Sequence, residues 1–254
     1  SWWYLRSYRL YFIHCTLGLL GNYMDQLKTI AVIGSTGSVG EQALDVIRSM
    51  PEKFKALALA AGSNQQRLEE QIKQFQPKAI FLASGLPTTT NIEKNIYQPL
   101  EVIVVRDDID IVLAASSGLD GLPAILAALR AGKKVALANK EALVVGGPVV
   151  RQALEFGEPY GAELRPVDSE HSAIWQCLWG ESIDQVDQLI LTASGGAFRN
   201  LSIRELDNVT PTEALKHPTW QMGPKVTIDS ATLFNKGLEA LEACLLYTSP
   251  SPRD

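Results

Sequence analysis

Residues 28–40 read KTIAVIGSTGSVG, and this stretch decides the fold. Its first half, residues 28–33, is a short apolar run typical of a strand that is buried on both faces. The run ends at Gly34, and glycines recur at Gly37 and Gly40 before a segment with helical apolar spacing. A strand, a glycine-rich turn and a helix in this order predict a phosphate-binding βα unit, because glycine lets the backbone approach the ligand. An ordinary glycine-rich turn is the alternative, since GxxGxxG departs from the commoner GxGxxG spacing.

The units that follow repeat this alternation. Further strands are expected at 54–61, 78–83, 110–115 and 134–138, and helices at 41–50, 65–75 and 122–131. Apolar strands separated by amphipathic helices indicate a parallel sheet covered on both faces. The predicted fold class is therefore α/β, with a doubly wound, Rossmann-like, nucleotide-binding domain over residues 25–167.

The second half has a different pattern, and we interpret it as an incomplete α/β catalytic domain over residues 168–243. Its expected elements are a strand at 163–167, a helix at 171–178, a strand at 188–192, a loop to Asp229 and a helix from about Ser230. Trp175 and Trp179 stand at helical spacing, which favours packing in a core.

The two ends of the chain resemble neither half. Residues 1–24 are apolar but interrupted by Arg6, Arg9 and His14, so no run is long enough to span a bilayer. We interpret them as non-native or disordered upstream sequence before Met24, with a targeting segment as the alternative. Residues 244–254 end in a Pro/Ser stretch, and we interpret them as an aberrant or truncated tail.

Composition narrows the class of protein. The chain has 254 residues, 46% of them hydrophobic, and a net charge of −5. This is a globular composition, and the acidic balance argues against nucleic acid as a partner. Three cysteines without a CxxC pair exclude a disulfide scaffold and a thiolate zinc cluster, and they fit a reducing compartment.

The turn after the second predicted strand bears on the identity of a dinucleotide. It reads Ala61-Gly62-Ser63-Asn64 and contains no acidic residue to bind the ribose diol of NAD. An uncharged turn with hydroxyl and amide groups is compatible with a 2′-phosphate, so NADP is favoured. Arg67 either assists in binding that phosphate or is an ordinary solvated helix charge.

Polar residues also follow two later strands, at the edge where α/β sheets bind ligands. Asn139, Lys140 and Glu141 come directly after the strand at 134–138. Asp168 and Glu170 follow the strand at 163–167, where alternation would place both carboxylates on one face as oxygen ligands for a divalent cation. His171 is expected to cap or pack at a helix start rather than to bind metal.

The remaining motifs lie in residues 192–239. Residues 192–196, TASGG, have the hydroxyl and free backbone of an anion-binding turn. Asn235 and Glu239 are four residues apart and share a helix face, so Glu239 could complete a three-carboxylate site while Asn235 and Lys236 bind a phosphate. Trp220 and Met222 stand in a Pro/Gly loop that suits a lid over a substrate.

Six motifs in this order resemble the 1-deoxy-D-xylulose 5-phosphate reductoisomerase family, over about residues 27–243. They are GSTGSVG, LANKEAL, PVDSEHSAI, LTASGGAFR, HPTWQMG and IDSATLFNKGLEA. The resemblance implies NADPH-dependent, divalent-metal-dependent isomerisation and reduction of 1-deoxy-D-xylulose 5-phosphate to 2-C-methyl-D-erythritol 4-phosphate. This is the committed reductive step of the non-mevalonate isoprenoid pathway.

The resemblance also implies a set of site residues. For NADPH these are Gly34, Thr36, Gly37, Ser38, Val39, Gly62, Ser63, Asn64, Asn139, Glu141 and Gly223. For a bound Mg²⁺ or Mn²⁺ ion, with Co²⁺ as a further candidate, they are Asp168, Glu170 and Glu239. For the substrate they are Lys140, Ser169, Glu170, Ser194, His217, Trp220, Ser230, Asn235 and Lys236, of which Lys140, Glu170 and His217 are implied to be catalytic.

Relatives in this family are typically homodimers that act on a phosphorylated sugar, with no nucleic acid or membrane partner. The implied location is the cytoplasm for a bacterial source and the plastid stroma for a plant or alga. Two alternatives stay open: an inactive truncated fragment that only binds nucleotide, and another NADP-dependent dehydrogenase that uses no metal.

Overall fold

The computed structural model describes residues 26–85, 96–219 and 222–247. These residues divide into two compact units, with the boundary after Ser172. We describe each unit by itself. The predicted leader at 1–24, residues 248–254 of the predicted tail, and Trp220 lie outside the described residues. No helix among the described residues is both long enough and apolar enough to cross a membrane.

The first unit is built on a parallel sheet of six strands in the order β3-β2-β1-β4-β5-β6. The strands are β1 (Lys28–Ile33), β2 (Phe54–Ala61), β3 (Ala79–Leu82), β4 (Ile111–Ala114), β5 (Lys134–Leu137) and β6 (Glu163–Pro166). The helices are α2 (Ser38–Ser49), α3 (Gln65–Phe75), α4 (Leu100–Val104), α5 (Leu122–Arg130) and α6 (Lys140–Gly157), with a 3₁₀ turn, η2, at Glu158–Tyr160. This confirms the predicted doubly wound α/β fold.

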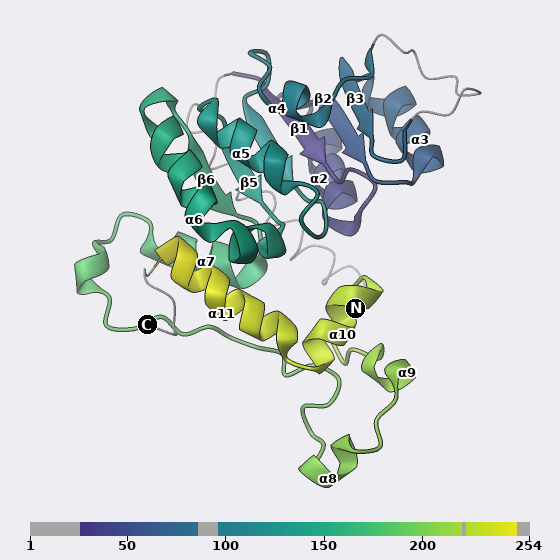
Figure 1. Cartoon of the computed structure of the whole chain (residues 1–254), viewed down its shortest axis with the longest axis vertical. Coiled ribbons are helices and arrows are strands. Elements are labelled where there is room, and N and C mark those ends of the chain that lie inside the picture. Colours follow the sequence, from purple (N-terminus) through teal and green to yellow (C-terminus); the bar gives the residue numbers. More distant parts are fainter. Residues whose placement is uncertain (1–25, 86–95, 220–221, 248–254) are drawn as a thin grey trace. The chain divides into compact units, whose positions relative to one another are not determined.

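The strand order reverses direction at β1, and the helices follow this reversal. The chain passes from β1 to β2 and β3 on one side of the sheet, and from β4 to β5 and β6 on the other. Parallel strands joined by right-handed crossovers then place α2 and α3 on one face and α5 and α6 on the other. Figure 1 shows this arrangement, with α5 and α6 on the near face.

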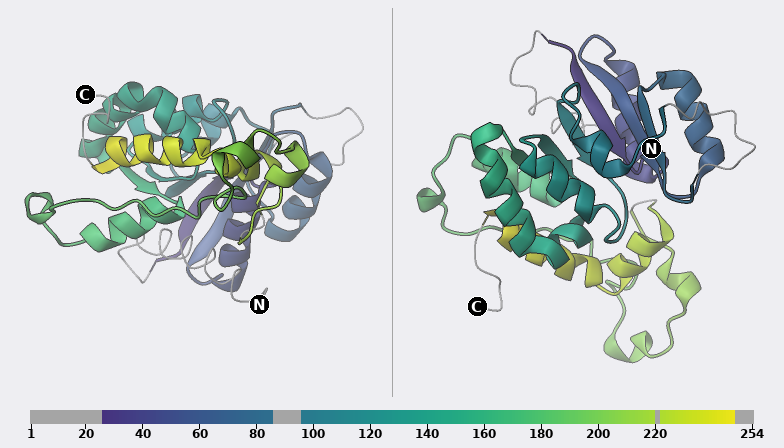
Figure 2. Two further views of the ribbon diagram at one scale, coloured as in Figure 1. Left: turned by 90° about the horizontal axis from the view of Figure 1, so that it is seen from below. Right: turned by 45° about the horizontal axis from the view of Figure 1, so that its top comes forward.

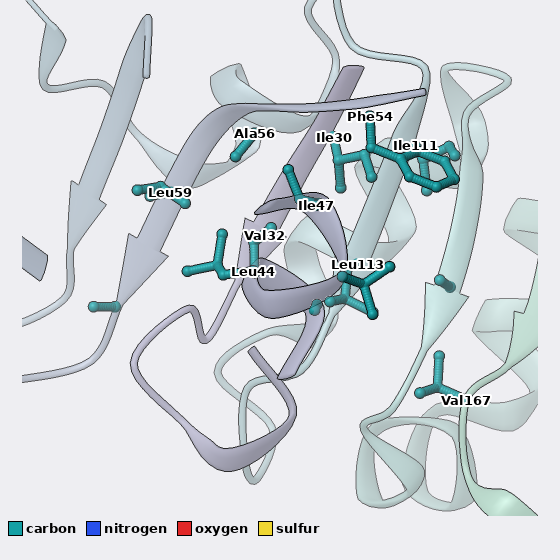
Figure 3. Packing of buried hydrophobic residues seen from close by; sticks show 14 of the residues in the cluster. Ile30, Val32, Leu44, Ile47, Phe54, Ala56, Leu59, Ile111, Leu113 and Val167 are labelled. Carbon is teal, nitrogen blue, oxygen red and sulfur yellow. The ribbon is translucent and has the colours of Figure 1, made fainter. Parts of the chain in front are cut away.

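The core of the first unit lies between the sheet and α2. Leu44 and Ile47 of α2 pack against Ile30 and Val32 of β1 and Leu59 of β2, and all five side chains are buried (Figure 3). The strands are apolar almost throughout because helices cover both of their faces. That pattern explains why β1 and β2 have the predicted bounds and the other strands differ from prediction by one or two residues. The bounds of α3 are also as predicted.

The second unit is helical among its described residues. The division of the chain falls inside α7 (Ser169–Leu178), and the unit continues through a 3₁₀ turn, η3 (Ile183–Gln185), α8 (Ile203–Leu206), α9 (Pro211–Ala214), α10 (Pro224–Ala231) and α11 (Phe234–Tyr247). Residues 186–196 form an extended segment without regular secondary structure (Figure 2).

Three predictions for the second half are therefore wrong. No strand forms at 188–192, where Ile190 is 72% exposed, because a strand needs a hydrogen-bonded neighbour and the described part of this unit offers none. The predicted loop to Asp229 instead contains α8, α9 and most of α10. Trp179 is 48% exposed, so it is not a core residue, and its ring is tilted against that of Trp175 at a centroid distance of 5.1 Å.

Candidate functional site

The glycine loop between β1 and α2 can exist only with glycine at two positions. Gly34 has φ +79°, and a Cβ there would lie 2.5 Å from the Ala115 carbonyl oxygen. A Cβ on Gly40 would lie 2.2 Å from the Gly34 carbonyl oxygen, so the helix starts in direct contact with the turn. Both distances are far below van der Waals contact, and the backbone therefore follows the path expected of a phosphate-binding turn.

The start of α2 is the candidate anion-binding element of this turn. Gly37 is the N-cap residue in an extended conformation, and no side chain caps the helix there. Thr36, Ser38 and Val39 stand at the partly or fully exposed positions around it. The first N–H groups of a helix lack partners in the helix, and they carry the positive end of its dipole. The loop has the geometry and electrostatics to bind a phosphate group.

The turn after β2 is exposed and uncharged. Gly62, Ser63 and Asn64 are all exposed, and the Asn64 side chain caps α3 by accepting from the Arg67 N–H at 3.1 Å. Arg67 itself pairs with two carboxylates, Glu41 at 2.6 Å and Glu70 at 2.6 Å. Hydrogen bonds to Glu41 raise the pKa of Arg67 further above its usual value. Its side chain pairs with these carboxylates and is 40% exposed, which fits the prediction of a solvated helix charge. A role in binding a 2′-phosphate stays a prediction.

Asn139 at the end of β5 connects the start of α6 to the loop after β4. Its side chain is 1% exposed, and its Oδ1 caps α6 by accepting from the Ala142 N–H at 3.0 Å. Its Nδ2 donates to the Gly118 carbonyl oxygen at 2.8 Å and lies 3.4 Å from Ser116 Oγ. The loop so held is the one whose Ala115 carbonyl lies against Gly34. Asn139 therefore fixes the neighbour of the glycine loop.

Lys140 and Asp168 form an ion pair at the same edge of the sheet. Lys140 is the first residue of α6, directly after β5, and Asp168 follows β6. Since β5 and β6 are parallel neighbours, their carboxyl ends bring the two side chains together. Sequence inspection did not predict this pair, although adjacent strand order would have suggested it.

Asp168 and Glu170 offer carboxylate oxygens within 4.8 Å of each other. The predicted reason, alternation along a strand, is wrong, because β6 ends at Pro166 and Glu170 lies in the first turn of α7. The Asp168 carbonyl accepts from the Ser172 N–H at 2.8 Å, so Asp168 begins the helix. Ser169 Oγ donates to Glu170 at 2.6 Å. His171 packs at the helix start and is fully buried, as expected.

In the second unit, a close backbone approach brings several candidate residues together. A Cβ on Gly196 would lie 2.3 Å from the Ser230 carbonyl oxygen, so the turn at 194–196 rests on the end of α10. Lys236 Nζ donates to the Thr192 carbonyl oxygen at 2.5 Å, which ties the same segment to α11. Hydroxyl groups of Ser194 and Ser230 and the Lys236 ammonium thus belong to one local structure.

The hydrogen bonds of His217 define its tautomer. The Thr219 N–H donates to His217 Nδ1 at 3.2 Å, and a backbone N–H can only donate. Nδ1 is therefore the acceptor, and the proton of the neutral ring is assigned to Nε2, which lies 3.0 Å from Ser194 Oγ. Ser194 Oγ also accepts from the Gly196 N–H at 3.2 Å. Its own O–H proton is then available to donate to an anion.

On α11, Asn235 and Glu239 share a helix face as predicted. The Asn235 side-chain amide donates to Glu239, and Lys236 forms an ion pair with the same carboxylate. Met222 is partly buried just before α10, and Gly223 is the N-cap residue of that helix. The candidate cofactor residues thus lie in the first unit except for Gly223, and most candidate substrate residues lie in the second.

Comparisons with known proteins point to one family. A family model described as 1-deoxy-D-xylulose 5-phosphate reductoisomerase matches residues 30–147, and one for its C-terminal domain matches residues 164–247. A curated protein of that name from Pelotomaculum thermopropionicum is 45% identical over 232 residues, which cover 87% of this chain and 59% of the relative. A relative of the same name from Nostoc is 47% identical over 232 residues.

Solved structures agree. The chain resembles a DOX-P reductoisomerase crystallised with NADPH, fosmidomycin and magnesium, with a TM-score of 0.77 and 36% identity, over 87% of this chain and 58% of that one. The reductoisomerase from Zymomonas mobilis in complex with NADPH gives a TM-score of 0.74 and 38% identity, over 89% of this chain and 59% of that one. The chain spans about three-fifths of the length of the curated relatives it matches.

Proposed function

Because the chain belongs to the 1-deoxy-D-xylulose 5-phosphate reductoisomerase family, we propose that it serves the NADPH- and metal-dependent conversion of that sugar phosphate to 2-C-methyl-D-erythritol 4-phosphate. One observation carries the proposal most directly. The glycine loop after β1 and the Lys140–Asp168 pair after β5 and β6 stand at the carboxyl edge of one parallel sheet. The proposed nucleotide loop and the proposed reaction centre are thus supported by their common position at one edge of the sheet.

The glycine loop suits the pyrophosphate of NADPH. Close backbone approach at Gly34 and Gly40, with an uncapped helix start at Gly37, leaves room and N–H donors for an anion. The exposed, acid-free turn at 62–64 suits a 2′-phosphate better than a bare ribose diol. NADPH, when bound, supplies the hydride for the reduction.

The carboxylates suit a hard divalent cation such as Mg²⁺ or Mn²⁺. Asp168 and Glu170 already offer two oxygens at close range, and Glu239 is proposed as the third ligand. Each of two carboxylates carries a lysine partner, Lys140 on Asp168 and Lys236 on Glu239. A cation bound there supplies Lewis-acid polarisation of the substrate's carbonyl and hydroxyl oxygens.

The second unit is proposed to bind the substrate's phosphate. Ser194, Ser230, Asn235 and Lys236 provide hydroxyl, amide and ammonium donors. His217 keeps the Ser194 oxygen engaged as an acceptor, so that the Ser194 O–H points its proton to the anion. Phosphate binding remote from the reacting carbons would orient those carbons without taking part in bond rearrangement.

Residues of the chain then serve the reacting end. The Lys140 ammonium is proposed to stabilise negative charge that develops on a substrate oxygen, and Glu170 to move protons, with Ser169 donating to it at 2.6 Å. Trp220 and Met222 are proposed as the flap that closes over the substrate and excludes water. The products are released after reduction of the rearranged aldehyde.

The partner and location are proposed from the same family membership. The partner is a phosphorylated sugar, the assembly is a homodimer, and the location is the cytoplasm, or the plastid stroma for a plant or algal source. Two rivals lead to different results. A fragment that only binds nucleotide would bind NADPH without substrate-dependent oxidation, and a metal-free dehydrogenase would oxidise it without a divalent cation.

The decisive experiment measures the binding of NADPH and the binding of Mn²⁺ separately. Titration with NADPH should quench or shift the protein fluorescence, and Mn²⁺ binding can be followed by electron paramagnetic resonance. Asp168→Asn, Glu170→Gln and Glu239→Gln should each weaken Mn²⁺ binding and leave NADPH binding intact, whereas Asp107→Asn, an exposed carboxylate elsewhere, should change neither. Normal Mn²⁺ binding by all three variants would refute the metal site.

A further inference from the structure

One buried amide below the glycine loop joins three elements. Gln71 lies on α3 and is 1% exposed. Its Nε2 donates to the Ser35 carbonyl oxygen at 2.9 Å and to Glu41 Oε1 at 2.8 Å. Ser35 belongs to the loop and Glu41 to the first turn of α2. A single side chain of α3 therefore connects the loop to both α2 and α3.

The contact with Ser35 determines the direction of a neighbouring donor. The Ser35 carbonyl and the Thr36 N–H belong to the same planar trans peptide group, in which they point in opposite directions. Because Gln71 draws the carbonyl inward, the Thr36 N–H faces away from the interior. Thr36 is partly exposed, and no protein group in the described ranges accepts a hydrogen bond from its N–H.

The orientation of the amide is itself fixed. Both of its close partners are acceptors, so the nitrogen, and not the oxygen, must face them. Glu41 is held in place by Arg67, whose Nε and a terminal nitrogen lie 2.6 and 2.7 Å from its two oxygens. This bidentate pair also neutralises a carboxylate that stands in the first turn of the anion-binding helix.

We propose that Gln71, braced by the Glu41–Arg67 pair, is a positioning residue that directs the Thr36 N–H to the pyrophosphate of the dinucleotide. The inference rests on the proposed function, which places NADPH on this loop. Since NADPH and NADH share the pyrophosphate, Gln71 contributes to the affinity for both cofactors equally. Selectivity between the two belongs to the turn after β2.

The test compares two variants of the 254-residue chain. Gln71→Met keeps the side-chain length and removes the donor, and it should weaken binding of NADPH and of NADH alike, by roughly tenfold for one lost hydrogen bond. Arg48→Met is the matched control, because Arg48 of α2 lies 3.3 Å from Gln74 of α3 and joins the same helices about two turns farther from the loop. It should lower the melting temperature without changing either dissociation constant.

Several results would overturn the inference. If Gln71→Met lowers the melting temperature but leaves both dissociation constants unchanged, the residue is merely structural. If only NADPH binding weakens, the residue acts on the 2′-phosphate and not on the pyrophosphate. If the unaltered chain binds NADPH tightly and Gln71→Met binds it equally well, the inference fails while the proposed function stands.

A second measurement needs no variant. In a ¹⁵N-labelled chain, the Thr36 amide resonance should shift on addition of NADPH and also on addition of inorganic pyrophosphate. An unmoved Thr36 resonance while other loop amides shift would overturn the inference alone. Absence of any NADPH binding by the unaltered chain would overturn the proposed function together with the inference.

Discussion

The two ends of the six-stranded sheet use their polar groups differently. At the amino end, the Thr29 N–H donates to Asp110 at 2.8 Å, and Lys133 Nζ donates to the carbonyl oxygens of Arg106 and Ile109 at 2.6 and 2.9 Å. Arg106 forms two hydrogen bonds with Asp108, at 2.8 and 2.9 Å. Polar groups at this end bind one another and connect the loop at 106–110 to β1 and β5.

At the carboxyl end, a glycine-dependent backbone turn stands beside side-chain contacts such as the Lys140–Asp168 ion pair. Glycines at 34 and 40 permit the turn, α2 begins without a side-chain cap, and Asn139 holds the neighbouring loop. The amino end therefore connects loops to the sheet, whereas the carboxyl end carries the backbone turn and side chains that we propose to bind ligands. Substitutions at the two ends should therefore separate stability from ligand binding.

The largest effect is expected from Gly34→Ala. Its Cβ would meet the Ala115 carbonyl oxygen at 2.5 Å, and φ +79° is unfavourable for alanine, so both strain and displacement follow. We expect a loss of about 3 kcal/mol or more in the free energy of unfolding, together with loss of NADPH binding. Urea denaturation measures the former. Gly62→Ala is the control, because its Cβ would meet nothing within 4 Å, and equal stability of the two variants would contradict the strain argument.

Asn139→Ala should lower both stability and binding. It removes the cap of α6 and the hydrogen bond to Gly118, which together are worth about 2 kcal/mol. Release of the loop beside Gly34 should also weaken NADPH binding several-fold, as fluorescence titration would show. A variant as stable as the original chain would rule out the connecting role of Asn139.

Lys133→Met tests the opposite end. It leaves two carbonyl oxygens without their ammonium donor, so we expect a loss of about 1 to 2 kcal/mol of unfolding free energy. NADPH affinity should stay unchanged, because this residue stands at the edge of the sheet opposite the proposed NADPH loop. A fall in NADPH affinity comparable with that of Asn139→Ala would remove the distinction between the ends.

Asp108→Asn should give the smallest and most pH-dependent effect. Hydrogen bonds from Arg106, with a smaller contribution from Lys78, lower the pKa of Asp108 from 3.8 to about 2. A lowered folded-state pKa stabilises the native state above the unfolded value, and the contribution is lost as the pH falls from 3.8 towards 2. Solvent screening limits it to about 1 kcal/mol or less.

The check for Asp108→Asn is urea denaturation at several pH values. The stability difference from the original chain should be constant between pH 5 and 7, on the order of the figure above, and shrink below about pH 4. A difference that grows on acidification would have the wrong sign.

The sheet could be predicted from sequence because its pattern is local. Residues 28–33 and 54–61 are continuous apolar runs between turn residues, and β1 and β2 have these bounds. The run at 188–192 looks similar, but strand formation depends on a partner elsewhere, and Ile190 is exposed instead. The apolar character of a segment does not indicate whether a neighbouring strand is available to pair with it.

Two short helices were missed although their signals are present. Ser202 and Glu205, and likewise Thr210 and Glu213, have capping-box spacing, and in each pair the N-cap N–H donates to the glutamate, at 2.7 and 2.8 Å. Hydrogen bonds from the Ser202 and Thr210 hydroxyl groups, and then those from their N–H groups, lower the pKa of the two glutamates. The spacing would have placed α8 and α9 in the predicted loop.

Part of the candidate site could also be predicted from the sequence, because its motifs are local. The order of the residues along the chain is enough to identify the glycines at 34, 37 and 40 and the polar residues that follow strands. Gln71 was missed, although a glutamine one turn after the buried Leu68 is a polar residue on a core face, a signal that could have been noticed. Its partners Ser35 and Glu41 are 36 and 30 residues away in the sequence, and only the fold brings them within reach.

The central place of β1 also bears on the order in which the sheet assembles. β1 is the first strand in the sequence and lies inside the sheet. The next two strands in the sequence, β2 and β3, can add to one of its edges. The other edge of β1 pairs with β4, which lies far along the chain. The hydrogen bond between Thr29 and Asp110, for example, joins residues 81 positions apart. Closing that long loop is the entropically costly event, so joining of β4 to β1 should limit the folding rate of the first unit.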